Sequence, residues 1–414
     1  MEVYRITRLQ VGYPGGPGGV LDRSYAWTGD MVDSIADNRF PGTTPPFTFA
    51  AQSQLFTYTP NNRLATAVGY YGSLGWTYDA NGNRTSETAN GVTSTYAYAP
   101  SSNRLLSITT GGAARAFTYD AAGDIVTDSR SGALGMTFQY DVEGRLSKAY
   151  KTNAPSDVST YGYDAFDRLA SRKTTSGGAT TTTLYIHDIK NHIIAETDAA
   201  GTTLREYIWL DDLPVAVVDK VDTGNPILAY VHTDHLGRPA LISSQNWDPL
   251  WYAIYSPFGA TSYISNAAGF SGQDIRFPGQ WFQLETGLAY NWRRHYDASI
   301  GRYLQPDPLG LQALIKDGAN VYDYVRQDPN AKTDPEGLLS TSRPEAPASP
   351  IDTCARKKKS PNYWCQSVDC GAPHGGVFDP LCPDCQSKLL NGTPMLLENG
   401  QLLTPPASTN TEEE

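Results

Sequence analysis

The sequence predicts an all-β protein in which short β-hairpins repeat and stack against one another. A tyrosine recurs every 20–23 residues, and a period of this size is typical of stacked supersecondary units. Many copies continue with Asp and a Gly three positions later, residue types that suit a tight turn. Apolar and polar residues alternate around these turns, as half-buried strands require. The recurring tyrosines are Tyr58, Tyr78, Tyr98, Tyr119, Tyr140, Tyr163, Tyr185, Tyr207 and Tyr230.

Each copy predicts two strands joined by a turn. A two-stranded unit is marginally stable alone, so neighbouring units must stack to bury the tyrosines. We therefore expect the tyrosine ladder to belong to the core. The alternative is that the ladder stacks on sugars or bases, since an aromatic face suits both roles.

Composition limits the classes of function. The chain has 414 residues, 18% of them charged, and a formal net charge of −11, which argues against a general nucleic-acid surface on the shell. No run of 18 apolar residues predicts a membrane span. Residues 1–9 lack the apolar core of a signal peptide and resemble the middle of a repeat, so we expect a fragment or a truncated gene.

Four zones follow from these patterns. Residues 1–57 contain degenerate repeats, and residues 58–229 carry the regular period of the predicted shell. Residues 230–338 lose the period and gain longer phrases. Residues 339–414 change composition and contain all five cysteines. We expect this last zone to be a small, largely irregular tail.

The third zone contains a series of ordered phrases. Tyr230-Val-His-Thr-Asp-His-Leu-Gly-Arg-Pro is followed by Gly301-Arg-Tyr-Leu-Gln-Pro-Asp-Pro-Leu-Gly-Leu and by Asp334-Pro-Glu-Gly-Leu. With the repeats, these phrases resemble the Rhs/YD-repeat family and its repeat-associated core domain. Relatives in that family include the C components of Tc toxins and the YD shells of teneurins.

The resemblance implies a spiral of β-hairpins that forms a hollow cocoon, with the core domain of residues 230–338 curling inward as a plug. About ten repeat units are present, so we expect a partial cocoon. The implied function is a bacterial scaffold, secreted or on the cell surface, that encloses or presents a variable C-terminal effector. A shell-completing protein or an immunity protein is the implied partner. A non-enzymatic adhesion scaffold and an inactive truncated fragment are the alternatives.

The resemblance also implies self-cleavage after the motif Asp-Pro-x-Gly-Leu, here at the Leu338–Leu339 bond. The cleaving aspartates carry over to Asp307 and Asp323. Two close carboxylates share a proton, so one can activate water while the other protonates the carbonyl oxygen. The alternative for Asp307 is a turn cap, and this is the interpretation that we prefer for Asp334.

One position departs from the family pattern. Many relatives have an arginine immediately before the first aspartate, where this chain has Pro306. Arg302 and Arg294 are the candidate substitutes. The segment between the two motifs, residues 312–319, is also longer than usual.

No cofactor is expected for the shell. For the tail cysteines the alternatives are a zinc site, disulfides and free thiols. Cys382 and Cys385 have the spacing of a zinc knuckle. A hydrolytic site of His374 with Asp369 or Asp379 is a weaker alternative, which the spacing does not favour. The four spaced cysteines are Cys365, Cys370, Cys382 and Cys385.

Two further clusters have structural interpretations. His232, Asp234 and His235 have the spacing of metal ligands but belong to a family phrase, so a metal role is the weaker alternative. Arg293 and Arg294 are expected to stack on nearby aromatic rings inside the plug. These rings are Tyr290, Trp292 and Tyr296.

Overall fold

The computed structural model describes residues 5–12, 21–39, 52–130 and 134–342, together with the backbone of two short strands. These two strands, β30 (Met395–Leu396) and β31 (Leu402–Leu403), form an antiparallel pair. The chain divides into two units, of which one is Ile6–Arg343 and the other combines Met1–Arg5 with Pro344–Glu414. The predicted cysteine and His374 sites lie outside the described residues.

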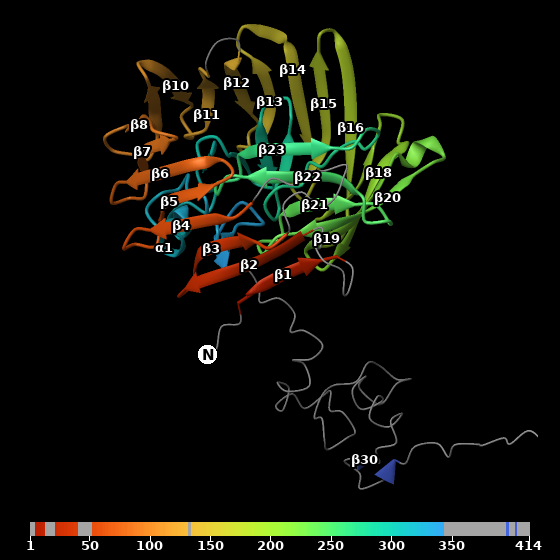
Figure 1. Cartoon of the computed structure of the whole chain (residues 1–414). Coiled ribbons are helices and arrows are strands. Elements are labelled where there is room, and N and C mark those ends of the chain that lie inside the picture. Colours follow the sequence, from red (N-terminus) through yellow and green to blue (C-terminus); the bar gives the residue numbers. More distant parts are fainter. Residues whose placement is uncertain are drawn as a thin grey trace, which may run out of the picture. The chain divides into compact units, whose positions relative to one another are not determined.

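A single antiparallel sheet of 23 strands dominates the fold, and each strand pairs with the next along the chain. The strands are β1 (Arg8–Val11), β2 (Leu21–Thr28), β3 (Met31–Asp37), β4 (Gln54–Tyr58), β5 (Leu64–Gly69), β6 (Gly72–Tyr78), β7 (Arg84–Ala89), β8 (Val92–Tyr98), β9 (Leu105–Thr110), β10 (Ala113–Tyr119), β11 (Ile125–Asp128), β12 (Met136–Tyr140), β13 (Leu146–Lys151), β14 (Ala154–Tyr163), β15 (Leu169–Ser176), β16 (Ala179–His187), β17 (Ile193–Thr197), β18 (Thr203–Leu210), β19 (Leu213–Asp219), β20 (Ile227–Thr233), β21 (Pro239–Ser243), β22 (Pro249–Tyr255) and β23 (Thr261–Asn266). Figure 1 shows the sheet winding from β1 through β14 to β23. The all-β hairpin shell is therefore confirmed.

Each repeat ends in a β-bulge that falls on the recurring aromatic residue. The ladder shifts register at Tyr78, Tyr119, Tyr140 and Tyr163, and an Asp-led turn follows directly. In the turn after Tyr163, one carboxylate oxygen of Asp164 accepts the backbone N–H groups of Phe166 and Arg168 at 2.8 and 3.0 Å. The bulge and the Asx turn together explain why Tyr-Asp recurs at this place.

The tyrosines also join neighbouring repeats. The hydroxyl of Tyr140 donates to the carbonyl oxygen of Ile125 at 2.7 Å, and that of Tyr163 donates to Leu146 at 2.8 Å. The rings of both tyrosines pack against the main buried cluster. The ladder thus combines apolar contact with a satisfied polar tip, as buried tyrosines require.

The predicted tyrosine series loses its phase after Tyr163. The bulge positions of the later repeats hold His187, Trp209 and Thr233. Tyr185 and Tyr207 lie two residues earlier on the same face and are buried, whereas Tyr230 lies three residues earlier and is 41% exposed. Tyr230 is therefore not a member of the buried ladder, because side chains an odd number apart point to opposite faces.

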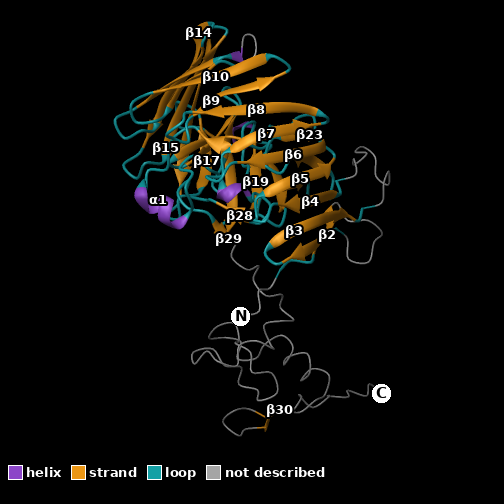
Figure 2. Ribbon diagram, turned by 90° about the vertical axis from the view of Figure 1, so that its left-hand side faces the viewer, coloured by secondary structure: helices purple, strands orange, loops and turns teal. Residues whose placement is uncertain are grey.

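Residues 267–342 form the plug, which packs against the inner side of the sheet. Its elements are the four-stranded sheet of β24 (Trp281–Gln283), β25 (Leu288–Asn291), β26 (Arg294–Asp297) and β27 (Arg302–Tyr303), helix α1 (Leu311–Lys316), the 3₁₀ turn η3 (Val325–Gln327), and the pair β28 (Lys332–Thr333) and β29 (Thr341–Ser342). A further 3₁₀ turn, η2 (Val221–Thr223), lies in the shell. Figure 2 shows α1 and β28–β29 beside the hairpins of the shell.

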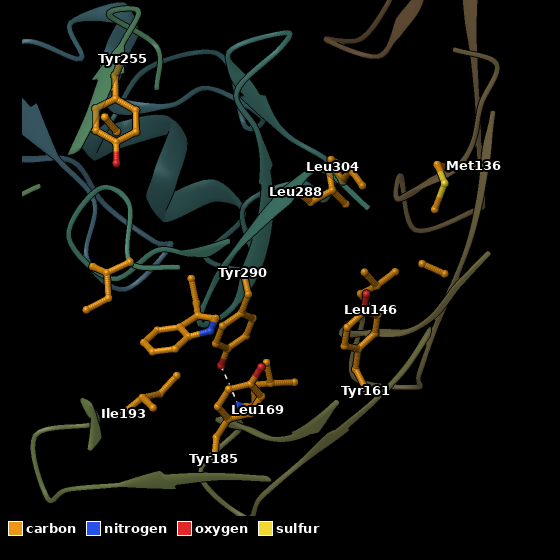
Figure 3. Packing of buried hydrophobic residues seen from close by; sticks show 14 of the residues in the cluster. Met136, Leu146, Tyr161, Leu169, Tyr185, Ile193, Tyr255, Leu288, Tyr290 and Leu304 are labelled. Atoms are coloured by element: carbon orange, nitrogen blue, oxygen red, sulfur yellow. Dashed lines mark hydrogen bonds between the residues drawn. The ribbon is translucent and has the colours of Figure 1, made fainter. Parts of the chain in front are cut away.

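Contacts between plug and shell are both apolar and polar. Leu288, Tyr290 and Leu304 share one buried cluster with shell residues such as Leu146 and Leu169. In Figure 3 the hydroxyl of Tyr290 points at Leu169, whose backbone N–H donates to it at 2.8 Å. The plug therefore replaces solvent on the inner face of the sheet.

The last strand of the sheet comes close to an early hairpin. The ring of Tyr263 in β23 contacts that of Tyr70, between β5 and β6, with centroids 5.9 Å apart. Strand β20 spans residue 230, and the sheet continues through β23 inside the zone predicted as the core domain. In the described ranges, no helix is long and apolar enough to cross a membrane.

Candidate functional site

Arg294 is the centre of a buried polar site in the plug. It begins β26, directly after a tight turn in which Trp292 takes a positive φ of 46°. One of its terminal nitrogens lies 3.0 Å from a carboxylate oxygen of Asp307 and 3.2 Å from one of Asp334. The guanidinium lies 3.7 Å from the ring centroid of Tyr303. The side chain is 2% exposed, so these carboxylates supply its charge balance.

The same side chains hold the turn that precedes the predicted cleavage bond. Asp334 accepts the backbone N–H of Leu338 at 2.8 Å, and the Nε of Arg294 donates to the carbonyl of Gly337 at 2.7 Å. The hydroxyl of Tyr303 donates to Asp334 at 2.7 Å. Gly337 has a φ of 66°, and a Cβ there would overlap the carbonyl oxygen of Asn291, so this turn requires glycine. Residues 334–338 are therefore fixed from both sides.

Asp307 combines the two roles considered for it. Its carboxylate accepts the N–H of Leu309 at 2.8 Å, which is a turn cap, and it also pairs with Arg294. Burial raises the pKa of Asp307, and the charge of Arg294 opposes that increase. The ion pair favours the charged form that a general base needs.

Asp323 lies in a different environment. It lines an open cavity of about 400 Å³ together with Arg63, Asp317, Arg326 and Lys332. Gln327 donates to its carboxylate at 2.5 Å. Burial, followed by the nearby charge of Asp317, raises the pKa of Asp323 to about 7. At neutral pH it therefore exists partly as the acid, the form that donates a proton.

The two predicted aspartates have different hydrogen-bond partners. Within residues 134–342, no hydrogen bond joins the carboxylates of Asp307 and Asp323. Arg294 connects Asp307 to the turn at Gly337. The charge of Asp317 raises the pKa of both aspartates, and its carboxylate accepts the backbone N–H of Ser340 at 3.0 Å. Arg294 thus contacts one end of residues 337–340, and Asp317 contacts the other end.

Of the two candidate helper arginines, Arg294 contacts the first aspartate. Arg302 donates to the carbonyl of Asn103 in the shell at 2.6 Å and lies over the ring of Tyr322. Its backbone forms an isolated β-bridge with Asp323. Sequence reasoning missed Tyr303, although it belongs to the same phrase as Asp307, and Asp317, which belongs to none of the phrases. The unusual length of segment 312–319 drew attention to the region of Asp317, but nothing in the sequence indicated that Ser340 is the partner of Asp317.

The other predicted clusters have structural partners. His232 bonds to Ser243 at 2.8 Å, and Asp234 forms a buried pair with Arg238. His235 bonds to the carbonyl of Asn330 at 2.8 Å, and burial lowers its pKa to about 4. Across the part of the chain that the structure describes, no His, Cys, Asp and Glu side chains gather as a metal site.

The predicted stacking holds for Arg293, whereas Arg294 lies over a ring outside the predicted set. Arg293 lies 5.3 Å from the ring centroid of Trp292, and Arg294 lies over Tyr303 rather than over Tyr290 or Tyr296. Arg293 also pairs with Asp167 of the shell at 3.1 Å.

Comparisons with known proteins agree with this fold. A 265-residue stretch is 28% identical to Double-stranded DNA deaminase toxin A of Burkholderia cenocepacia, covering 51% of this chain and 18% of that relative. A 116-residue stretch is 36% identical to Toxin protein Tse5 of Pseudomonas aeruginosa, covering 28% of this chain and 8% of Tse5. The chain thus spans less than a fifth of either relative.

Solved structures give the same result for the fold. The crystal structure of TcdB2-TccC3 superposes with a TM-score of 0.64 at 21% identity, covering 81% of this chain and 18% of the other. The Photorhabdus luminescens Tc holotoxin pore gives a TM-score of 0.63 at 20% identity, covering 82% of this chain and 18% of the other. Residues 46–330 match the family described as Teneurin YD-shell, which is more than half of the sequence. With its bulged Tyr-Asp hairpins wound around an inner plug, the chain belongs to the YD-shell family.

Proposed function

We propose that this chain is a bacterial Rhs-type shell that encloses or presents a variable C-terminal effector and releases it by aspartyl self-cleavage after Leu338. The names of the relatives support the first part, since two curated matches are toxins. The proposal places the protein outside the producing cell or on its surface. A partner that completes the shell, or one that neutralises the effector, belongs to the same proposal.

The proposal of cleavage depends on one observation, which is that side-chain contacts fix residues 334–338. Arg294 contacts Asp307, Asp334 and the carbonyl of Gly337, next to the bond at which the sequence changes composition. A fixed peptide segment beside a carboxylate favours reaction, because orientation replaces part of the activation entropy.

The proposed roles of Asp307 and Asp323 follow from their different surroundings. Asp307, whose charged form the ion pair with Arg294 favours, would take a proton from the attacking water. Asp323, whose pKa is raised to about 7, would supply the proton to the peptide. Water adds to the carbonyl carbon of Leu338, and the C–N bond to Leu339 breaks. The products are a carboxylate on Leu338 and an amine on Leu339.

The test is the mass of the chain after expression and purification in denaturant. The expected result is two fragments divided between Leu338 and Leu339, and an intact chain in the variants Asp307→Asn and Asp323→Asn. Asp222→Asn, at an exposed position of the shell, is the matched control and should cleave normally. An intact wild-type chain of 45.0 kDa would contradict release by cleavage and would favour an adhesion scaffold or an inactive fragment.

A further inference from the structure

Asp317 holds the chain on the far side of the predicted cleavage bond. It directly follows helix α1, and its own N–H donates to the carbonyl of Ala313 at 2.7 Å. One carboxylate oxygen accepts the backbone N–H of Ser340 at 3.0 Å, and the other accepts the hydroxyl of Ser340. This residue is therefore tied twice to a single position of the chain.

The two anchors leave a short span between them. Asp334 fixes the N–H of Leu338, and Asp317 fixes the N–H and hydroxyl of Ser340. The Leu338–Leu339 bond lies between these points. Asp317 also lines the cavity that contains Asp323, and its charge is among the causes that raise the pKa of Asp323. The anchor is thus adjacent to the predicted acid.

We infer that Asp317 is a positioning residue for self-cleavage, which sets the place of the scissile bond by fixing Ser340. This inference rests on the proposed function and deepens it. Displacing reacting atoms by about 1 Å can reduce a rate by about 100-fold. Loss of one of the two anchors should therefore produce a measurable decrease in the rate of cleavage. Loss of the anchor should also let the chain slip, so that neighbouring bonds are cut.

The first experiment compares the time course and cut position of full-length variants. Asp317→Ala should slow cleavage at least about tenfold and spread it over bonds near Leu338. Asp317→Asn keeps an oxygen for the N–H of Ser340 and should rescue most of the rate and the single cut site. Thr341→Val, which loses only a bond to the carbonyl of Thr333 at 3.2 Å, is the control and should cleave as wild type does.

A second experiment measures the anchor without cleavage. In the full chain carrying Asp307→Asn, amide hydrogen exchange of Ser340 should be at least about tenfold faster after Asp317→Ala. The amide of Leu338, bonded to Asp334, should keep its protection.

The outcomes separate the two claims. If the wild type is cut and Asp317→Ala is cut at the same rate and the same bond, the inference is overturned and the proposed function stands. If Asp317→Asn is as inactive as Asp307→Asn, Asp317 acts in the chemistry and a positioning role is wrong. If the wild type remains intact, the proposed function fails, and with it the inference, even if the exchange result shows the contact.

Discussion

Replacing Arg294 by methionine tests the central ion pairs of the plug. The change keeps an apolar stem of similar length but removes the cation between the carboxylates of Asp307 and Asp334, which lie 3.0 and 3.2 Å from it. Breaking a buried pair by removing one partner costs about 3–5 kcal/mol, because the remaining charge stays buried and uncompensated. We expect the free energy of unfolding to fall by about 4 kcal/mol at pH 7.5.

The loss should depend on pH in a defined direction. Burial already raises the pKa of Asp307 above 3.8, and Arg294 is the opposing cause, so the variant raises that pKa further. The folded variant then binds more protons than the unfolded chain between about pH 4 and its new pKa. The variant is therefore destabilised above the new pKa of Asp307, and it recovers stability as pH falls below that pKa. The recovery amounts to about 1.4 kcal/mol for each unit by which the substitution raises the pKa of Asp307.

The assay is urea unfolding followed by tryptophan fluorescence at pH 7.5 and pH 4.5, with chain integrity checked by mass. Arg293→Met is the matched control, since Arg293 pairs with Asp167 while both side chains are more than a third exposed. Such surface pairs contribute about 0–1 kcal/mol. A loss below about 1 kcal/mol for Arg294→Met, or an equal loss at both pH values, would refute the reasoning.

Three other changes test the shell and the turn. Gly337→Ala should cost about 1–3 kcal/mol more than Gly91→Ala in urea unfolding, because both have positive φ but only Gly337 lacks space for a Cβ; equal losses would contradict the packing argument. Asp124→Asn should raise the unfolding midpoint at pH 8 and leave it unchanged at pH 4, because burial raises the pKa of Asp124 to about 7 and the native state loses that proton as pH rises; a rise at both pH values would point to another cause. Tyr163→Phe should cost about 0.5–1.5 kcal/mol in the same assay, since it removes the hydrogen bond to Leu146, and a neutral result would exclude a role for the ladder hydroxyl.

The shell could be predicted because its signal is local and repeated. Tight-turn residues and alternating strands recur together, and each hairpin needs its neighbour to bury its aromatic face. The tyrosines alone do not mark the same position in every repeat. The position that recurs in each repeat is the β-bulge before the turn, and in the later repeats it is occupied by His187, Trp209 or Thr233. The turn aspartates Asp188 and Asp234 keep that phase and were the better marker.

The candidate site was predictable only in its parts. Asp307, Arg294 and the Leu338 bond came from family phrases, and the cap role of Asp334 came from turn chemistry. The bridge of Arg294 between two carboxylates joins positions 13 and 40 residues away in sequence, and no local pattern gives such a contact. Asp317 was hidden for the same reason, since its partner Ser340 lies 23 residues later.

The contacts that hold residues 337–340 come from the folded plug, and the plug in turn contacts the shell. Tyr322, two residues after Asn320, donates to the carbonyl of Gly123 at 2.8 Å, and Asn103 donates to the carbonyl of Ala319 at 2.6 Å. These two contacts attach residues 319–322, shortly after Asp317, to the shell. An unfolded chain has none of them, so its aspartates cannot be placed beside the Leu338 bond. On the proposed function, the plug must therefore seat against the shell before the chain is cut.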